Sequence, residues 1–206
     1  MTKSLPDLPT RRRLLRAAAL PLAAALALDL AACSPQDAPA PKAEPGSVKP
    51  DEAYALLAKE GKGFAVGSLM SANTVYVLFD PQCPHCGHLW QQALPLHKKV
   101  KFVWMPVSFI NAKSTPQGAA LLAAPNPVQA MTEHEASIVA GTGGMAASAS
   151  IPDDMAAAIK KNTDLFNRLG GESVPFIVAK NASNGQAVTN AGAMETAALE
   201  QFLGLN

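Results

Sequence analysis

A pair of cysteines stands between a strand-like segment and a helix-like one, and this arrangement limits the folds open to the chain. Residues 74–79 read TVYVLF, a continuous β-branched and aromatic run that is typical of a strand buried on both faces. Cys83-Pro84-His85-Cys86 follows almost at once, and the next residues, HLWQQAL, have helical composition. A buried strand that leads directly into a helix predicts an α/β domain with Cys83 near the amino terminus of that helix.

Three common uses of a cysteine pair fit the residues poorly. Covalent haem attachment needs a histidine directly after the second cysteine, and Gly87 stands there. Structural zinc needs four ligands, whereas Cys83, Cys86 and either His85 or His88 supply three at most. A purely structural disulfide across two residues closes so short a loop that it would stabilise the fold little.

A redox-active dithiol explains more of the local chemistry. The unpaired N–H groups at a helix start favour an anion, so a thiolate at Cys83 would be stabilised and would act as the nucleophile. His85 can add positive charge or a hydrogen bond, and Pro84-His85 therefore favours a more oxidising pair. Cys86, one turn further in, would be the resolving thiol. Such chemistry requires neither a metal nor an organic cofactor.

The rest of the chain supplies the elements of one domain. We expect helices at 51–60 and 195–203, strands at 101–109, 173–180 and 187–189, a turn at Asn184-Gly185, and an alanine-rich helical insert over 114–169 that breaks at 141–150. Trp90 is expected in the core and His88 on the solvated side of its helix. His97 and His134 are expected at the surface.

The amino-terminal residues have the composition of an export signal and a tether. Four arginines between residues 11 and 16 precede a short apolar run, so residues 1–32 are interpreted as an export signal that resembles the twin-arginine type. Leu30-Ala31-Ala32-Cys33 resembles a bacterial lipoprotein box, in which Cys33 would be acylated. Residues 33–50 are rich in proline and small residues and predict a disordered tether to a domain at 51–206.

The strand, Cys-Pro-His-Cys, the helix and the late Val174-Pro175 together resemble the thioredoxin superfamily, and the bacterial Dsb proteins in particular. The Cys-Pro-His-Cys centre resembles DsbA, whereas Asp80-Pro81 and residues 89–93 resemble the DsbC/DsbG catalytic domain. The resemblance implies a thioredoxin-like fold, a central mixed sheet flanked by helices with an inserted helical region. It also implies that Val174-Pro175 is a cis peptide that faces the cysteines and contacts the substrate.

Three departures from these families alter what the resemblance implies. Val77 stands where thioredoxin carries a buried acidic residue, six positions before the first cysteine. Between Cys33 and Phe64 there is no room for the dimerisation domain of DsbC and DsbG, so we expect a monomer that is not an isomerase. Val174 replaces the threonine common in DsbC and DsbG, which again favours the DsbA type.

The resulting hypothesis is a periplasmic thiol:disulfide oxidoreductase, anchored to a membrane by lipid at Cys33. Its expected partners are exported client proteins with cysteines and a membrane redox partner, and the oxidase direction is favoured. A formal charge of +1 gives no electrostatic reason to expect nucleic acid. Two alternatives stay open: a DsbG-like reductase of oxidised cysteines, and a metal-binding or chaperone protein that uses Cys83, Cys86 and His85.

Overall fold

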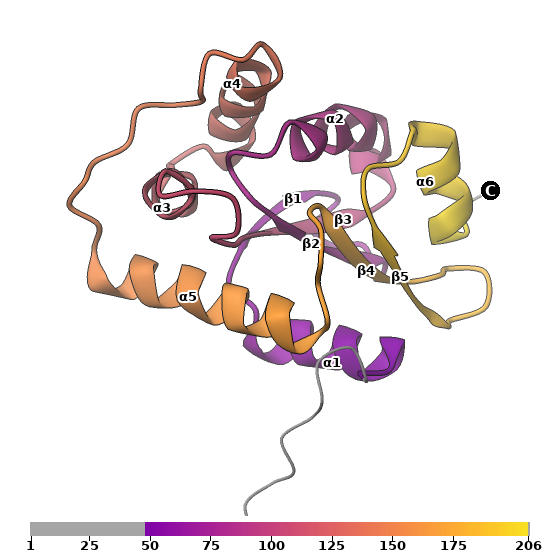
Figure 1. Ribbon diagram of the computed structural model, residues 1–206. Helices are drawn as coiled ribbons and strands as arrows, with labels where there is room; N and C mark the ends of the chain where they lie inside the picture. The colour runs from indigo at the N-terminus through magenta and orange to yellow at the C-terminus, as the bar shows by residue number, and fades with distance from the viewer. Residues whose placement is uncertain (1–47, 206) are drawn as a thin grey trace, which may run out of the picture. The chain divides into compact units, whose positions relative to one another are not determined.

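The computed structural model describes residues 48–205, which form a mixed five-stranded sheet covered by helices on both faces (Figure 1). The strands are β1 (Phe64–Gly67), β2 (Thr74–Phe79), β3 (Lys101–Pro106), β4 (Phe176–Lys180) and β5 (Ala187–Ala191). Their order across the sheet is β1-β3-β2-β4-β5. Only the β2–β3 pair is parallel, and the other neighbouring strands are antiparallel.

The helices are α1 (Pro50–Glu60), α2 (Pro84–Ala93), α3 (Ser114–Leu122), α4 (Pro127–Val139), α5 (Asp153–Arg168) and α6 (Thr196–Leu203), and a 3₁₀ turn, η1 (Leu94–Lys98), follows α2. In Figure 1, α1 and α5 lie below the sheet while α2 and α6 lie above it. Helix α4 packs along α2, and α3 contacts α5 and β3. This arrangement confirms the predicted thioredoxin-like architecture.

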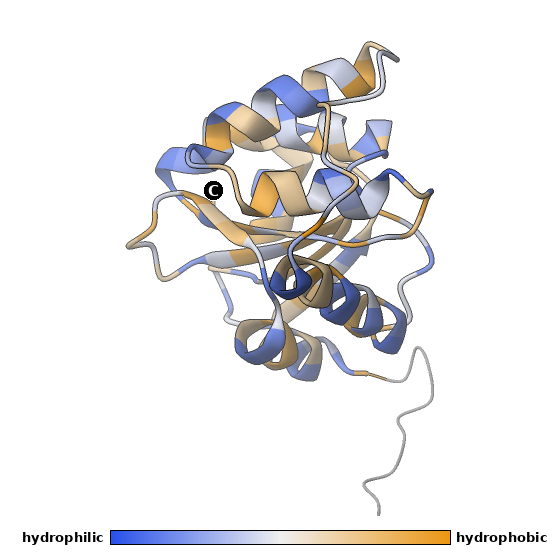
Figure 2. Cartoon of the chain, turned by 90° about the vertical axis from the view of Figure 1, so that its left-hand side faces the viewer, coloured by the Kyte–Doolittle hydropathy of each residue, from blue (hydrophilic) through white to orange (hydrophobic). Residues whose placement is uncertain are grey.

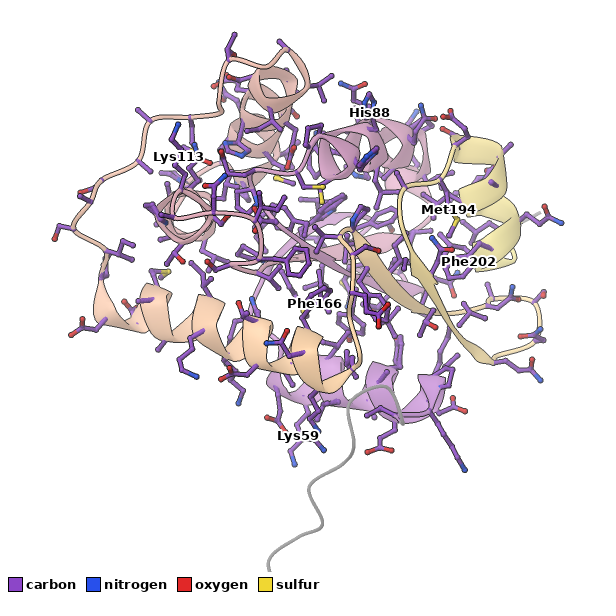
Figure 3. All side chains as sticks on the ribbon, viewed as in Figure 1. Lys59, His88, Lys113, Phe166, Met194 and Phe202 are labelled. Carbon is purple, nitrogen blue, oxygen red and sulfur yellow. The ribbon has the colours of Figure 1, made fainter. Side chains whose placement is uncertain are left out.

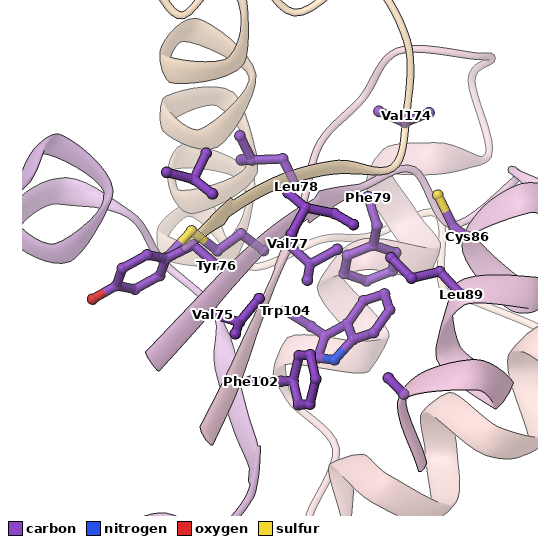
Figure 4. Close-up of a cluster of buried hydrophobic side chains, with 14 of the residues drawn as sticks. Val75, Tyr76, Val77, Leu78, Phe79, Cys86, Leu89, Phe102, Trp104 and Val174 are labelled. Atoms are coloured by element: carbon purple, nitrogen blue, oxygen red, sulfur yellow. The ribbon is translucent and has the colours of Figure 1, made fainter. Parts of the chain in front are cut away.

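The central strand β2 explains why the sheet has helices on both faces. All six residues of Thr74–Phe79 are buried, so the strand needs apolar partners above and below. In the core shown in Figure 4, the Phe79 ring packs edge-on against Trp104 of β3, with ring centroids 5.5 Å apart. Trp104 packs in turn against Trp90 of α2 at 5.2 Å, so Trp90 lies in the core as predicted. Figure 2 shows hydrophilic residues along the outer sides of the helices.

The strand expected at 101–109 ends at Pro106, because the backbone N–H groups of residues 108–110 donate to side chains and not to a neighbouring strand. Ser108 N donates to Thr163 Oγ1 at 2.9 Å, and Phe109 N and Ile110 N donate to the Asp80 carboxylate. The chain therefore leaves the sheet one residue after Val107, whose N–H still bonds Phe79 O. Strand β1 was not predicted, because its four residues are too few to give a periodic pattern.

The helical insert was predicted in the right place and breaks where its glycines lie. Between α4 and α5, Gly141, Gly143 and Gly144 adopt positive φ, which residues with a side chain rarely do. The expectation that His134 lies at the surface is wrong. It is 1% exposed on the inner side of α4, and His97 is half-buried beside Trp90. Across residues 48–205, no helix is both long and apolar enough to cross a membrane.

The buried position of β2 predicts a large cost for shortening its side chains. Leu78→Ala should lower the free energy of unfolding by about 3 kcal/mol, because Leu78 is fully buried and the truncation leaves a cavity. Urea denaturation measures this change. The matched control, Leu69→Ala, removes a leucine that is 59% exposed and should alter stability by less than about 0.5 kcal/mol. Equal effects of the two substitutions would contradict this description of the core.

Candidate active site

Cys83 lies at the junction of β2 and α2, where the sequence places the start of a helix. It is the N-cap residue of α2, with extended backbone angles, and Pro84 occupies the first helical turn. Proline is well tolerated there because the first N–H groups of a helix have no partner within it. The backbone N–H groups of Cys86 and Gly87 both point to Cys83 O, at 3.0 and 3.4 Å. The thiol of Cys83 therefore lies at the positive end of a helix.

The two thiols are free and lie in unequal surroundings. Cys83 is 4% exposed and Cys86 is fully buried, so the first cysteine is the more accessible, as predicted, although both are buried. Figure 4 shows Cys86 on the inner side of α2, near Leu89 and Phe79. Pro84 and His85, by contrast, are exposed on the outer side of the helix start. An attacking sulfur can thus reach Cys83, while Cys86 is reached only from within the site.

Val174-Pro175 lies against the first cysteine. Its peptide bond is cis, as predicted, and Cys83 Sγ donates a hydrogen bond to Val174 O at 3.5 Å. The chain then enters β4 at Phe176, beside β2. The backbone carbonyl group of Val174 therefore lies directly beside the Cys83 thiol.

The pKa values of the two thiols are shifted in opposite directions. The pKa of Cys83 is lowered to about 7, mainly by the hydrogen bond from the Cys86 side chain, although burial opposes this shift. The backbone N–H groups of Cys86 and His85 and the charge on His85 lower it further by smaller amounts. Burial raises the pKa of Cys86 well above its usual value, and the neighbouring Cys83 and Glu135 raise it further. Cys83 therefore ionises more readily, and Cys86 stays a thiol at neutral pH.

A buried carboxylate organises the loop in front of the cysteines. Asp80 is fully buried, and its carboxylate accepts four hydrogen bonds. One oxygen accepts from Gln82 N at 2.8 Å and from Ser114 Oγ at 2.7 Å. The other accepts from Phe109 N at 2.7 Å and from Ile110 N at 2.8 Å. Phe109 and Ile110 are thereby held beside the site, although their side chains are 48% and 45% exposed. The Phe109 ring also packs against the ring of Phe166, a buried residue of α5 (labelled in Figure 3).

Helix α4 brings two ionisable side chains, His134 and Glu135, to the active-site loop, and neither was predicted to lie there. His134 Nε2 lies 2.7 Å from Pro81 O, and its Nδ1 accepts a hydrogen bond from Met145 N at 3.1 Å. Burial lowers the pKa of His134, so the ring is neutral and links the segment before Cys83 to the glycine-rich loop. Glu135 is fully buried as well, and burial with the nearby Cys83 and Asp80 raises its pKa well above the usual value.

The histidines of the motif do not form a metal site in this part of the chain. His85 and His88 are both exposed on α2 (His88 is labelled in Figure 3), with ring centroids 6.4 Å apart. Among residues 48–205, no three side chains of the histidine, cysteine and acidic types gather closely enough to hold a metal ion. A cavity of about 550 Å³ lies elsewhere, between Lys62, Leu122 and α5. Cys33 falls outside the described residues.

Comparisons with known proteins agree with this fold. No family model matches the chain. It is 32% identical over 160 residues to the thiol:disulfide interchange protein DsbG of Pseudomonas aeruginosa, an alignment that covers 73% of this chain and 61% of DsbG. It is 31% identical over 112 residues to DsbG of Escherichia coli, covering 53% of this chain and 44% of the relative. The chain thus spans less than two thirds of either relative.

Solved structures show the same fold at lower identity. The catalytic domain of Proteus mirabilis ScsC superposes with a TM-score of 0.58 at 17% identity, covering 74% of this chain and 93% of that domain. A periplasmic thioredoxin-like protein from Salmonella enterica serovar Typhimurium gives 0.57 at 18% identity, covering 73% and 93%. The chain therefore has the thioredoxin-like fold of these structures. In sequence it is similar to the two DsbG proteins over part of their length.

The thiol environments predict how the reduced protein titrates. Absorbance of the thiolate near 240 nm should rise with an apparent pKa of about 7, from Cys83 alone. In Cys86→Ala this pKa should move upward, because the Cys86 thiol supplies the largest stabilising hydrogen bond. An unchanged titration in that variant would show that the helix start alone sets the pKa of Cys83.

The raised pKa of Glu135 predicts that the stability this residue gives to the folded chain falls as the pH rises above 4.5. Its pKa is higher in the folded chain than the ordinary 4.5, so its contribution to stability is complete below pH 4.5 and is lost as the pH rises towards the folded value. Glu135→Gln cannot ionise, so its stability relative to the natural protein should increase with pH above 4.5, by at most about 1.4 kcal/mol per pH unit. Urea denaturation at pH 5 and pH 8 measures the difference. A gap that stays constant with pH would mean that Glu135 is ionised in the folded chain.

Proposed function

We propose that this protein is a thiol:disulfide oxidoreductase that exchanges disulfides with cysteine-bearing client proteins through Cys83 and Cys86. The observation that carries the proposal is the pair of unequal thiols at the start of α2. Cys83 has a pKa of about 7, whereas Cys86 is buried and remains protonated. The similarity to two proteins named thiol:disulfide interchange protein DsbG supports the same chemistry.

The reaction proceeds in two exchanges. The Cys83 thiolate attacks one sulfur of a client disulfide, a bond forms between Cys83 and the client, and the other client sulfur leaves as a thiolate. Cys86 then loses its proton and attacks Cys83, which releases the second client thiol and leaves the Cys83–Cys86 disulfide. The client has gained two electrons that the protein has lost. The same steps in reverse oxidise a client dithiol.

The client backbone is expected to lie along Val174. Val174 O accepts a hydrogen bond from the free Cys83 thiol, so it becomes available to a donor of the client when Cys83 is in the mixed disulfide. Pro175 cannot donate a hydrogen bond, which leaves Val174 as the backbone position that such a chain can pair with. Pro84 and His85 border the same opening, and both are exposed.

The direction of electron flow is the finer part of the proposal. Pro84-His85 favours the oxidase direction, because charge on His85 stabilises the thiolate and so destabilises the disulfide. A second candidate, reduction of client disulfides or oxidised cysteines, is supported by the Cys83 pKa of about 7. That value matches a thioredoxin-like reductant rather than a strong oxidant, whose thiolate has a pKa of about 3.5.

Substituting one cysteine at a time tests the reaction. Cys86→Ala should accumulate a covalent complex with insulin, used as a disulfide-bonded client, because nothing resolves the mixed disulfide. Non-reducing electrophoresis and mass spectrometry identify the complex. Cys83→Ala should form none, and Cys33→Ser should behave as the natural protein. A Cys86→Ala variant that folds yet never captures the client would refute the proposed function.

Periplasmic location and a lipid anchor at Cys33 complete the proposal, with a membrane redox partner that resets the dithiol. The export-like residues 1–32 and the lipobox-like end at Cys33 support it, and these residues lie outside the described part of the chain. In a Gram-negative host, the natural protein should incorporate labelled palmitate and sediment with membranes. Cys33→Ser should lose both properties, and palmitate incorporation that survives this substitution would rule out Cys33 as the anchor.

A further inference from the structure

The position of Glu135 connects it to the resolving cysteine. Helix α4 packs along α2 at Gly87, the residue directly after Cys86. A Cβ atom at Gly87 would lie 3.0 Å from Glu135 Oε2 and 3.2 Å from Glu135 O, so the missing side chain leaves the room that the carboxyl group occupies. The acid of α4 and the Cys86 thiol therefore face the same turn of α2.

The surroundings of Glu135 give it no structural partner. It is fully buried, and neither carboxyl oxygen has a hydrogen-bond partner among residues 48–205. Leaving a buried polar group unpaired typically costs about 1–3 kcal/mol. Asp80, the other buried carboxyl group nearby, accepts four hydrogen bonds and so is fully engaged in holding the loop. Of these two buried carboxyl groups in residues 48–205, Glu135 is the one whose oxygens are free to take up a proton.

The groups around Glu135 restrict what it can exchange a proton with. Cys83 and Cys86 lie on the α2 side, and Asp80 lies at the end of β2. His134, the preceding residue of α4, has both ring nitrogens engaged. His85 and His88 are exposed on α2, Glu133 is exposed on α4, and Lys113 is exposed before α3. Of the buried groups, Cys86 is the one that must lose and regain a proton during disulfide exchange.

We propose that Glu135 is the proton-exchange partner of Cys86, so that the inserted helix α4 supplies the acid–base group for the resolving step. This inference rests on the proposed function. In the step that releases a mixed disulfide, the Glu135 carboxylate takes the proton from Cys86 Sγ. The resulting thiolate forms the bond to Cys83 Sγ, and the client sulfur leaves with the bonding electron pair. In the opposite direction Cys86 leaves as a thiolate, and Glu135 returns the proton.

The charge on Cys83 determines at which step Glu135 can accept the proton from Cys86. In the dithiol form, the Cys83 thiolate repels a negative charge on Glu135 and on Cys86, and raises the pKa of each. A mixed disulfide at Cys83 removes that charge. Both pKa values then fall, so the carboxylate becomes available when Cys86 has to be deprotonated.

The test follows the resolution of a mixed disulfide with glutathione. The reduced protein is mixed with oxidised glutathione, quenched with acid, and analysed by mass spectrometry for the Cys83–glutathione species between pH 5 and pH 9. At pH 6 the species should disappear about a hundredfold more slowly in Glu135→Gln than in the natural protein, a typical effect of losing a general base. The rates should converge at high pH, where Cys86 ionises unaided.

Further variants separate this role from a structural one. Glu135→Asp should recover part of the rate, and Glu135→Leu should behave as Glu135→Gln, so the test stands even if one substitution distorts the site. Glu133→Gln, two residues away on the exposed side of α4, should leave the rate and its pH profile unchanged. Circular dichroism confirms that each variant is folded.

Failure of this inference and failure of the proposed function give different experimental results. If folded Glu135→Gln and Glu135→Leu resolve the mixed disulfide at the natural rate and with the natural pH profile, the role of Glu135 is overturned and the proposed function still stands. If the natural protein itself never converts the mixed disulfide into Cys83–Cys86, the proposed function fails and takes the inference with it.

Discussion

The Asp80 carboxylate accepts four hydrogen bonds where β2 ends, and the geometry of the dithiol depends on it. One oxygen fixes the turn that carries Gln82 and the amino terminus of α3, and the other fixes the loop at Phe109 and Ile110. The backbone of Asp80 also accepts the N–H of Cys83 at 3.0 Å. A single buried group therefore sets where the first cysteine begins its helix and which apolar side chains surround it.

The placement at a helix start also separates the pKa values of the two thiols. Cys83 receives the N–H groups of the first turn and a hydrogen bond from Cys86, so its thiolate is stabilised. Cys86 is fully buried, where charge is unfavourable, so its pKa is raised. Position 77 carries no acidic residue, but α4 brings the buried Glu135 against Gly87 of α2, the residue directly after Cys86.

Local sequence patterns were sufficient to predict most of the fold. They did not predict the ionisable side chains that α4 brings to the site. The six buried residues of β2 and the proline-started α2 could be predicted, because strand and helix patterns are local. The length of β3 could not be predicted, because the N–H groups that follow it donate to Asp80 and Thr163, which are distant in sequence. His134 and Glu135 were missed for the same reason, since the packing of α4 on α2 is a tertiary contact. A signal existed, however: both residues share the inner face of the helix with Met131 and Ile138, at helical spacing.

The reduction potential of the Cys83–Cys86 pair tests the central claim most directly. The purified protein is equilibrated with glutathione buffers, and the fraction of dithiol is measured after acid quenching and thiol alkylation. We predict one reversible two-electron couple between about −270 mV, as in thioredoxin, and about −120 mV, as in a strong disulfide donor. A Cys83–Cys86 pair that shows no reversible couple in these buffers would contradict the account.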